Sequence, residues 1–189
     1  IRDVESDYLM VVDANMAALK TDAVISRRVD YKVEQSTGGL IADLSIKYSH
    51  NGNFDWRTTR YRTYTRVYVP SGSKLLSYDG QSEGVVNVNT EFNKTVFSVF
   101  VSIEPGERGT LHLRYRLPDN IVNQITGGEY NVLVQRQAGN DTDFSIDLDF
   151  LSEINGFAPS NFFAEKVDSS QVIWQNKLNS DTLYSVSFK

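Results

Sequence analysis

The chain has 189 residues, of which 40% are hydrophobic and 12% aromatic, and it contains no cysteine. This apolar content is enough for a buried core, which excludes a disordered tail or linker, and the lack of cysteine excludes disulfides, thiolate nucleophiles and cysteine-ligated metal. With 19 Lys and Arg against 24 Asp and Glu, the formal charge is −5, so the chain lacks the positive field typical of nucleic-acid-binding proteins.

Cofactor and membrane signals are also sparse. His50 and His112 are the only histidines, so a multi-histidine metal site is excluded, and we expect no cofactor and no metal. No apolar run approaches the length of a membrane span, so we expect no membrane insertion by this fragment. The chain begins at Ile1 without a signal-peptide pattern, which indicates a fragment of a longer precursor or an engineered form.

The first 22 residues differ from the rest. Tyr8 to Val12 form a short apolar run followed by Asp13-Ala14-Asn15, which predicts a buried strand and a turn. This strand is either the last strand of a preceding domain or an extra edge strand of this one. Residues 13–19 are long enough for a single helical turn.

Alternation with a period of two dominates residues 23–118. In 23–35, Ile25, Val29, Tyr31 and Val33 share one face while charged residues share the other, as in a half-buried strand. Seven strands with turns every ten or so residues predict an antiparallel, immunoglobulin-like β-sandwich over 23–118. The expected strands are 23–35, 40–48, 60–69, 74–78, 85–88, 95–103 and 109–117.

Residues 119–189 continue the β pattern, and residues 119–126 are long enough for a single helical turn. Four strands over about 60 residues are marginal on their own, so we expect them to pack on the sandwich or to extend it. Residues 152–170, with the pair Phe162-Phe163, are expected to form a loop. The whole chain is therefore predicted to be all-β with very little helix. The four strands are 129–137, 143–150, 171–178 and 182–188.

Four segments taken in order resemble a known family. They are 7–15 with 20–22, 64–76, 105–118 and 130–139, and together they resemble the C-terminal region of the bacterial membrane-anchored family called domain of unknown function 4012. The resemblance implies an extracellular, cell-surface protein with a membrane anchor and a larger domain upstream of Ile1. It implies no activity, and no catalytic residue is carried over from it.

The clearest candidate binding surface is basic and aromatic. Residues at alternate positions of 60–69 and of 109–117 would form one platform if these two strands were neighbours. Guanidinium groups suit phosphate or carboxylate and tyrosine rings suit sugars, so this face is a candidate site for an anionic cell-surface polymer. The alternative is a solvated face whose arginines pair with acids on adjacent strands, and we favour it, with strand 143–150 supplying the acids. The residues are Arg60, Arg62, Tyr64, Arg66 and Tyr68, with His112, Arg114 and Arg116.

Three smaller patterns have two interpretations each. The turn Gly139 to Asp143 holds oxygen ligands suited to calcium, but a polar hairpin is favoured because the spacing fits no calcium loop. Ser71 to Lys74 matches the serine–lysine pattern of penicillin-recognising enzymes, but it lies in a Pro-Gly turn and lacks their further motifs. Trp174 is predicted in the core, whereas Trp56 either caps the sandwich end or is exposed for stacking on a sugar.

The sequence thus predicts a non-catalytic structural or binding module of a bacterial surface protein, whose partner is an anionic surface polymer or another surface protein. The alternative is an accessory domain that positions an upstream enzymatic domain on cell-wall or surface polymer. An enzyme within this fragment is disfavoured because histidine and cysteine chemistry is nearly absent.

Overall fold

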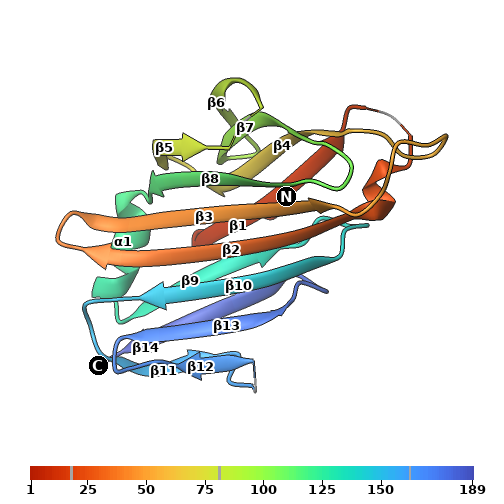
Figure 1. The fold of residues 1–189 in the computed structure, drawn as a ribbon. Coiled ribbons are helices and arrows are strands. Elements are labelled where there is room, and N and C mark those ends of the chain that lie inside the picture. The colour runs from red at the N-terminus through yellow and green to blue at the C-terminus, as the bar shows by residue number, and fades with distance from the viewer. Residues whose placement is uncertain (18, 81, 162) are drawn as a thin grey trace.

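The computed structural model describes residues 1–17, 19–80, 82–161 and 163–189. Strands make up 61% and helices 6% of these described residues. Two seven-stranded sheets pack face to face as a sandwich (Figure 1). The predicted all-β sandwich with very little helix is therefore confirmed.

Each sheet contains strands from both halves of the chain. Sheet A has the order β11-β14-β9-β1-β4-β7-β6, and sheet B has the order β12-β13-β10-β2-β3-β8-β5. The strands of sheet A are β1 (Asp7–Asn15), β4 (Tyr61–Pro70), β6 (Glu83–Glu91), β7 (Lys94–Ile103), β9 (Glu129–Gln135), β11 (Ile154–Ala158) and β14 (Thr182–Phe188). Those of sheet B are β2 (Ile25–Ser36), β3 (Gly39–His50), β5 (Lys74–Asp79), β8 (Arg108–Arg116), β10 (Thr142–Asp149), β12 (Ala164–Lys166) and β13 (Gln171–Lys177).

One parallel pair in each sheet joins the two halves. β9 runs parallel to β1 in sheet A, and β10 runs parallel to β2 in sheet B, whereas the other strand pairs are antiparallel. The strands after residue 119 therefore extend both sheets of one sandwich. β1 is an internal strand between β9 and β4, which differs from the edge position considered for it.

The core lies between the sheets and follows from the alternation. Tyr31 and Val33 of β2 belong to the same buried cluster as Val67 and Phe97 of sheet A. Trp174 is fully buried in it, as predicted. Aliphatic and tyrosine side chains from both inner faces supply the apolar surface whose burial drives folding.

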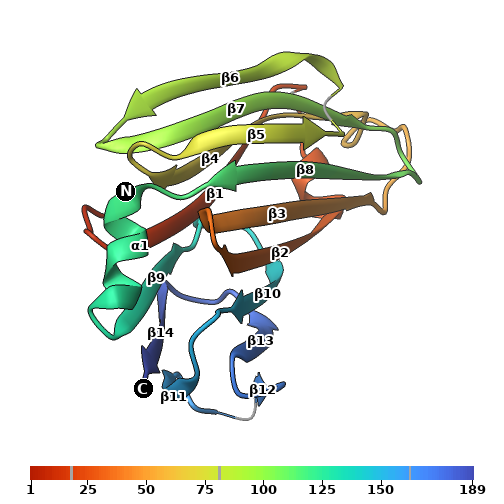
Figure 2. The ribbon, with the colours of Figure 1, turned by 90° about the vertical axis from the view of Figure 1, so that its left-hand side faces the viewer.

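Three local predictions have different outcomes. The helical turn expected at 119–126 is part of an eight-residue helix, α1 (Asp119–Thr126), which covers one end of the sandwich (Figure 2). The helical turn expected over 13–19 is wrong for residues 13–15, because Asp13 and Asn15 continue β1, and a 3-10 helix follows at Thr21–Val24; Ala18 lies outside the described residues. The loop expected over 152–170 contains the short strands β11 and β12, and Phe162 lies outside the described residues.

Candidate functional site

The arginine platform expected from the sequence does not form. β4 belongs to sheet A and β8 to sheet B, and both strands send their alternate apolar residues into the same core. Arg62 and Arg66 therefore lie on the outer face of one sheet, and Arg114 and Arg116 on the outer face of the other. One shared platform would require the two strands to be neighbours, and they are not.

The predicted site residues on sheet A mostly form ion pairs or packing contacts with neighbouring side chains. Arg62 Nη2 lies 2.6 Å from Glu83, and Arg66 Nη1 lies 3.7 Å from Glu91. The set also includes Arg60, which pairs with Glu104; Tyr64, which packs against Phe100; and Tyr68, which is buried in a small outer cluster with Tyr8, Val96 and Leu133.

On sheet B, Arg114 pairs with Asp43 at 3.3 Å, whereas Arg116 is exposed and forms no ion pair with a described residue. His112 is exposed beside Ser45 on the next strand. The acids that pair with the predicted arginines come from β3, β6 and residue 104. Strand β10 was expected to supply them, but it pairs with β2 and β13, so that part of the prediction is wrong.

The acidic turn and the serine–lysine pattern assemble no site. Asp141 and Asp143 both pair with Lys177, at 3.3 and 3.6 Å. Over the described ranges, no three His, Asp or Glu side chains gather in a way that would hold a metal ion. Residues 71–73 form the turn between β4 and β5, where the Ser73 hydroxyl donates to the carbonyl of Pro70 at 2.7 Å.

Two aspartates of β1 point into the sandwich. Asp7, Leu9, Val11 and Asp13 share its inner face. Asp7 is fully buried and accepts hydrogen bonds from the hydroxyls of Tyr31 (2.8 Å) and Tyr130 and from the backbone N–H of Tyr8 (2.7 Å). Burial raises the pKa of Asp7 to about 6, although these donors pull it downward.

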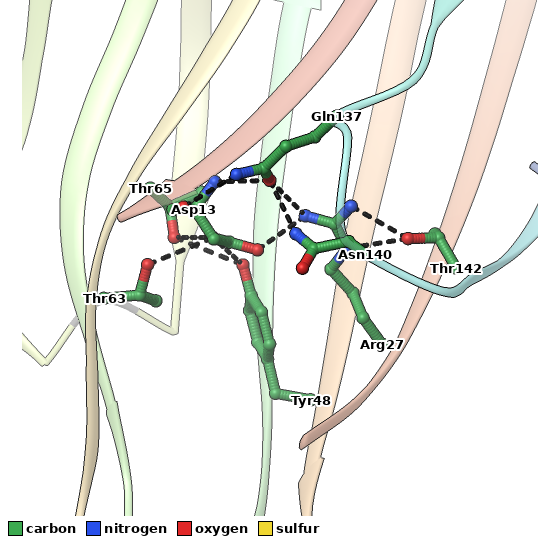
Figure 3. Close-up of polar contacts among 8 residues, drawn as sticks. All are labelled: Asp13, Arg27, Tyr48, Thr63, Thr65, Gln137, Asn140 and Thr142. Carbon is green, nitrogen blue, oxygen red and sulfur yellow. Dashed lines mark hydrogen bonds and ion pairs between the residues drawn. The ribbon is translucent and has the colours of Figure 1, made fainter. Parts of the chain in front are cut away.

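Asp13 forms the second buried network, which links the two sheets (Figure 3). Its Oδ2 accepts from Arg27 at 2.6 Å, and its Oδ1 accepts from Tyr48 at 2.8 Å and from Thr65 at 2.7 Å. Arg27 in turn donates to Thr142 from Nε and Nη2 at 3.0 and 2.8 Å. Gln137, Asn140 and Thr63 complete the network.

A buried ion pair with this many partners fixes the position of one sheet relative to the other. Both side chains are less than a tenth exposed, and their charged atoms are occupied by hydrogen bonds. A cavity of about 230 Å³ opens beside them, lined also by Asp22, Tyr61 and Asp141. Because the Asp13 and Arg27 groups are saturated from within, we assign them a structural role.

A larger cleft of about 700 Å³ lies beside α1 and the first residues of the chain. Its buried Lys94 ammonium lies 5.1 Å from the centre of the Tyr8 ring and 3.7 Å from the Asp3 carboxylate. Glu5 also lines this cleft, so the cleft carries both signs of charge. The contacts anchor the N-terminal segment on the outer face of sheet A.

The opposite end of the sandwich exposes a set of apolar and basic side chains that sequence reasoning did not bring together. The loop after β1 and the loop between β3 and β4 lie together at the right-hand end of Figure 1. A backbone hydrogen bond joins the two loops, from Lys20 N to the carbonyl of Arg57 (2.9 Å), and Met16 N donates to the carbonyl of Arg62 at the start of β4 (2.7 Å). We define the loop-end patch as the exposed residues Met16, Leu19, Lys20, Phe54, Trp56 and Arg57.

Trp56 is the most exposed large apolar side chain of the patch, at 83%, and Phe54 follows at 66%. Asp55 holds this loop in shape, because its Oδ1 accepts from the N–H groups of Arg57 and Thr58, both at 2.7 Å. These bonds lower the pKa of Asp55. The Arg57 guanidinium lies 5.3 Å from the centre of the Trp56 ring. The interpretation that Trp56 caps the sandwich end is therefore wrong.

Comparison with known proteins shows the fold alone. No protein-family profile matches the chain, and no curated protein matches its sequence. The resemblance to domain of unknown function 4012 therefore stays a prediction.

Among solved structures, a candidate nutrient-binding protein from Legionella pneumophila aligns with a TM-score of 0.54 at 6% identity, over 96% of this chain and 70% of that one. Leukotriene A4 hydrolase from Saccharomyces cerevisiae aligns with a TM-score of 0.50 at 8% identity, over 92% of this chain and 30% of that one. The chain thus spans less than a third of the yeast enzyme.

Proposed function

We propose that this chain is a non-catalytic, extracellular module of a bacterial surface protein that binds an anionic surface polymer through the loop-end patch. One observation carries the proposal: Trp56 is exposed on a loop whose conformation is fixed by Asp55. An aromatic ring held outward before binding stacks on a sugar ring at little entropic cost.

The charge around Trp56 supports an anionic ligand. Arg57 lies against the tryptophan ring, and the backbone of Lys20 is bonded to that of Arg57. Neither basic side chain forms an ion pair with a described residue. Both cations therefore remain available to phosphate or carboxylate groups of a polymer, next to a surface that stacks on its sugars.

The buried polar groups support a non-catalytic role. Asp7 and Asp13 are the acids that the fold removes from solvent, and each is saturated with tyrosine, threonine or arginine donors. A general acid or base must reach a substrate proton, and the oxygens of these carboxylates are occupied by internal donors. No helix in the described ranges is long and apolar enough to cross a membrane.

The alternative function is an accessory domain that positions an upstream enzymatic domain on cell-wall polymer. One observation favours it, since the yeast hydrolase holds this fold within a much longer chain. In that case a longer precursor would be enzymatically active while residues 1–189 alone are inert and still bind the polymer.

Co-sedimentation with insoluble cell wall tests the proposed function. The probe is peptidoglycan carrying its teichoic polymer, compared with peptidoglycan from which that polymer has been stripped. We expect the protein to sediment with the intact wall, and Trp56→Ala and Arg57→Ala to reduce the bound fraction about tenfold, as for removal of an interface hot spot. The double variant Arg62→Ala/Arg66→Ala is the matched control, because these arginines are paired with acids elsewhere, and it should bind normally. Equal loss in both sets would overturn the proposal.

A further inference from the structure

Strand β6 is an exposed sheet edge. It is the last strand of sheet A and, among the described residues, pairs only with β7; it forms the uppermost strand in Figure 2. Val88 is 52% exposed and Val85 62%. Edge strands with free main-chain groups are templates for pairing with another strand.

The hairpin that joins β6 to β7 determines which main-chain groups are free. Phe92 and Asn93 form its two-residue turn, and both have positive φ angles, of 51° and 56°. In such a hairpin the flanking residues Glu91 and Lys94 exchange both backbone hydrogen bonds, and every second residue does the same. Glu91, Asn89 and Asn87 therefore bond to β7.

The main-chain N–H and C=O groups of Thr90 and Val88 consequently point away from the sheet, into solvent. The register is regular from Asn87 to Glu91, and its irregularity lies further back, between Glu83 and Asn87.

β6 is bulged between Glu83 and Asn87, but its regular part, from Asn87 to Glu91, lacks the residues that usually protect an edge strand. Its sequence contains neither lysine nor proline, and residues 84–90 carry no charge. Its two terminal acids, Glu83 and Glu91, are engaged by Arg62 and Arg66. The other sheet edges are shorter, with six residues in β5, five in β11 and three in β12.

We propose that β6 pairs with β6 of a second copy of this chain, antiparallel, about a two-fold axis at Val88. This register places Val88 opposite Val88 and Val86 opposite Thr90, so that the free groups of one copy meet those of the other. No like charges face each other, because Glu91 lies opposite Val85. A closed two-fold interface of this kind is self-complementary by construction.

The side chains fit the same register. Val86 is 8% exposed and belongs to the core, and Val88 and Thr90 lie on the same face of the strand because side chains alternate. Pairing brings the Val88 side chains together and continues the inner face of sheet A across the axis. The observation that selects a second copy over another partner is this symmetry of sequence around Val88.

Cysteine cross-linking tests the register directly, because the chain has no native cysteine. Val88→Cys would place the two Cα atoms about 5.5 Å apart, within disulfide range. The control is Leu183→Cys, since Leu183 is equally exposed, at 52%, but lies on the internal strand β14 of the same sheet. Under mild oxidation we expect Val88→Cys to form dimers at least about tenfold faster than Leu183→Cys, because pairing raises the effective concentration.

Sedimentation of cysteine-free protein provides the second measurement. We expect a monomer–dimer equilibrium between about 1 µM and about 1 mM, abolished by Val88→Lys and retained by Leu183→Lys. A monomer throughout this range, or equal cross-linking of both cysteine variants, would overturn the proposal. Retained dimers in Val88→Lys would also overturn it.

Discussion

Asp7 couples folding to pH. Its folded-state pKa of about 6 lies above the ordinary value of 3.8, so between these values the folded protein binds a proton that the unfolded chain does not. The contribution of Asp7 to stability therefore grows as the pH falls from above about 6 to below about 4, and is lost as the pH rises through the folded pKa.

We predict that Asp7→Asn removes this contribution. Asparagine keeps an acceptor for Tyr31 and Tyr130 and carries no charge. Relative to the variant, the wild type should gain on the order of 3 kcal/mol between about pH 7.5 and about pH 4, measured by urea unfolding at several pH values. A difference between the two proteins that stays constant with pH would contradict this account.

Arg27 compensates the buried charge of Asp13. We predict that Arg27→Met lowers the free energy of unfolding by about 3 to 5 kcal/mol, because it leaves the Asp13 carboxylate buried without a cation. Asp13→Leu/Arg27→Met should recover part of that loss, since no charge then remains. Arg114→Ala is the control, because its pair with Asp43 is exposed and should contribute less than about 1 kcal/mol. Equal effects of Arg27→Met and Arg114→Ala would refute the structural role of the network.

Part of this residue-scale pattern can be predicted from the sequence. Asp7, Leu9, Val11 and Asp13 occupy alternate positions, so a buried strand here places both acids on the apolar face. Their partners cannot be predicted in this way, because Arg27, Tyr48 and Thr142 come from other strands. The signal for a polar network was thus present, but its geometry required the fold.

At the scale of elements, β1 gains protection from its two neighbours. Because it lies between β4 and β9, its amides are bonded on both sides of the strand. We predict slow hydrogen exchange over residues 8–12, measured by mass spectrometry or NMR. Fast exchange throughout 8–12 would show that β1 frays.

Strand positions were more predictable than strand partners. Alternation located β2, β3, β4 and β8, because each buries one face. β11 and β12 lack regular alternation and pair over only a few residues, so the sequence predicts a loop in their place. The assignment of β4 and β8 to different sheets was not predictable, because sheet membership depends on crossovers that sequence periodicity does not encode.

At the scale of the whole molecule, the charged side chains on the sheet faces mostly form ion pairs with one another. The basic side chains of the loop-end patch form no ion pair with a described residue. The predicted arginine face is divided between two sheets, and the acids that pair with it lie on neighbouring strands. Trp56 was the sequence signal that could have located the patch, because it lies in a loop, but its exposure depends on the turn that Asp55 organises.

Trp56 fluorescence tests the proposed binding role most directly, because Trp56 is exposed and the other tryptophan, Trp174, is buried. The titrant is a soluble teichoic-type polymer with sugar and phosphate groups, and Trp56→Phe reports the constant signal of Trp174. We predict that the polymer shifts the emission of the wild type to shorter wavelength and protects it from acrylamide quenching. The effect should weaken as salt is raised, because screening acts beyond about 10 Å at 0.1 M. Unchanged emission of the wild type at saturating polymer, or an equal change in Trp56→Phe, would contradict the assignment of the loop-end patch as the binding site.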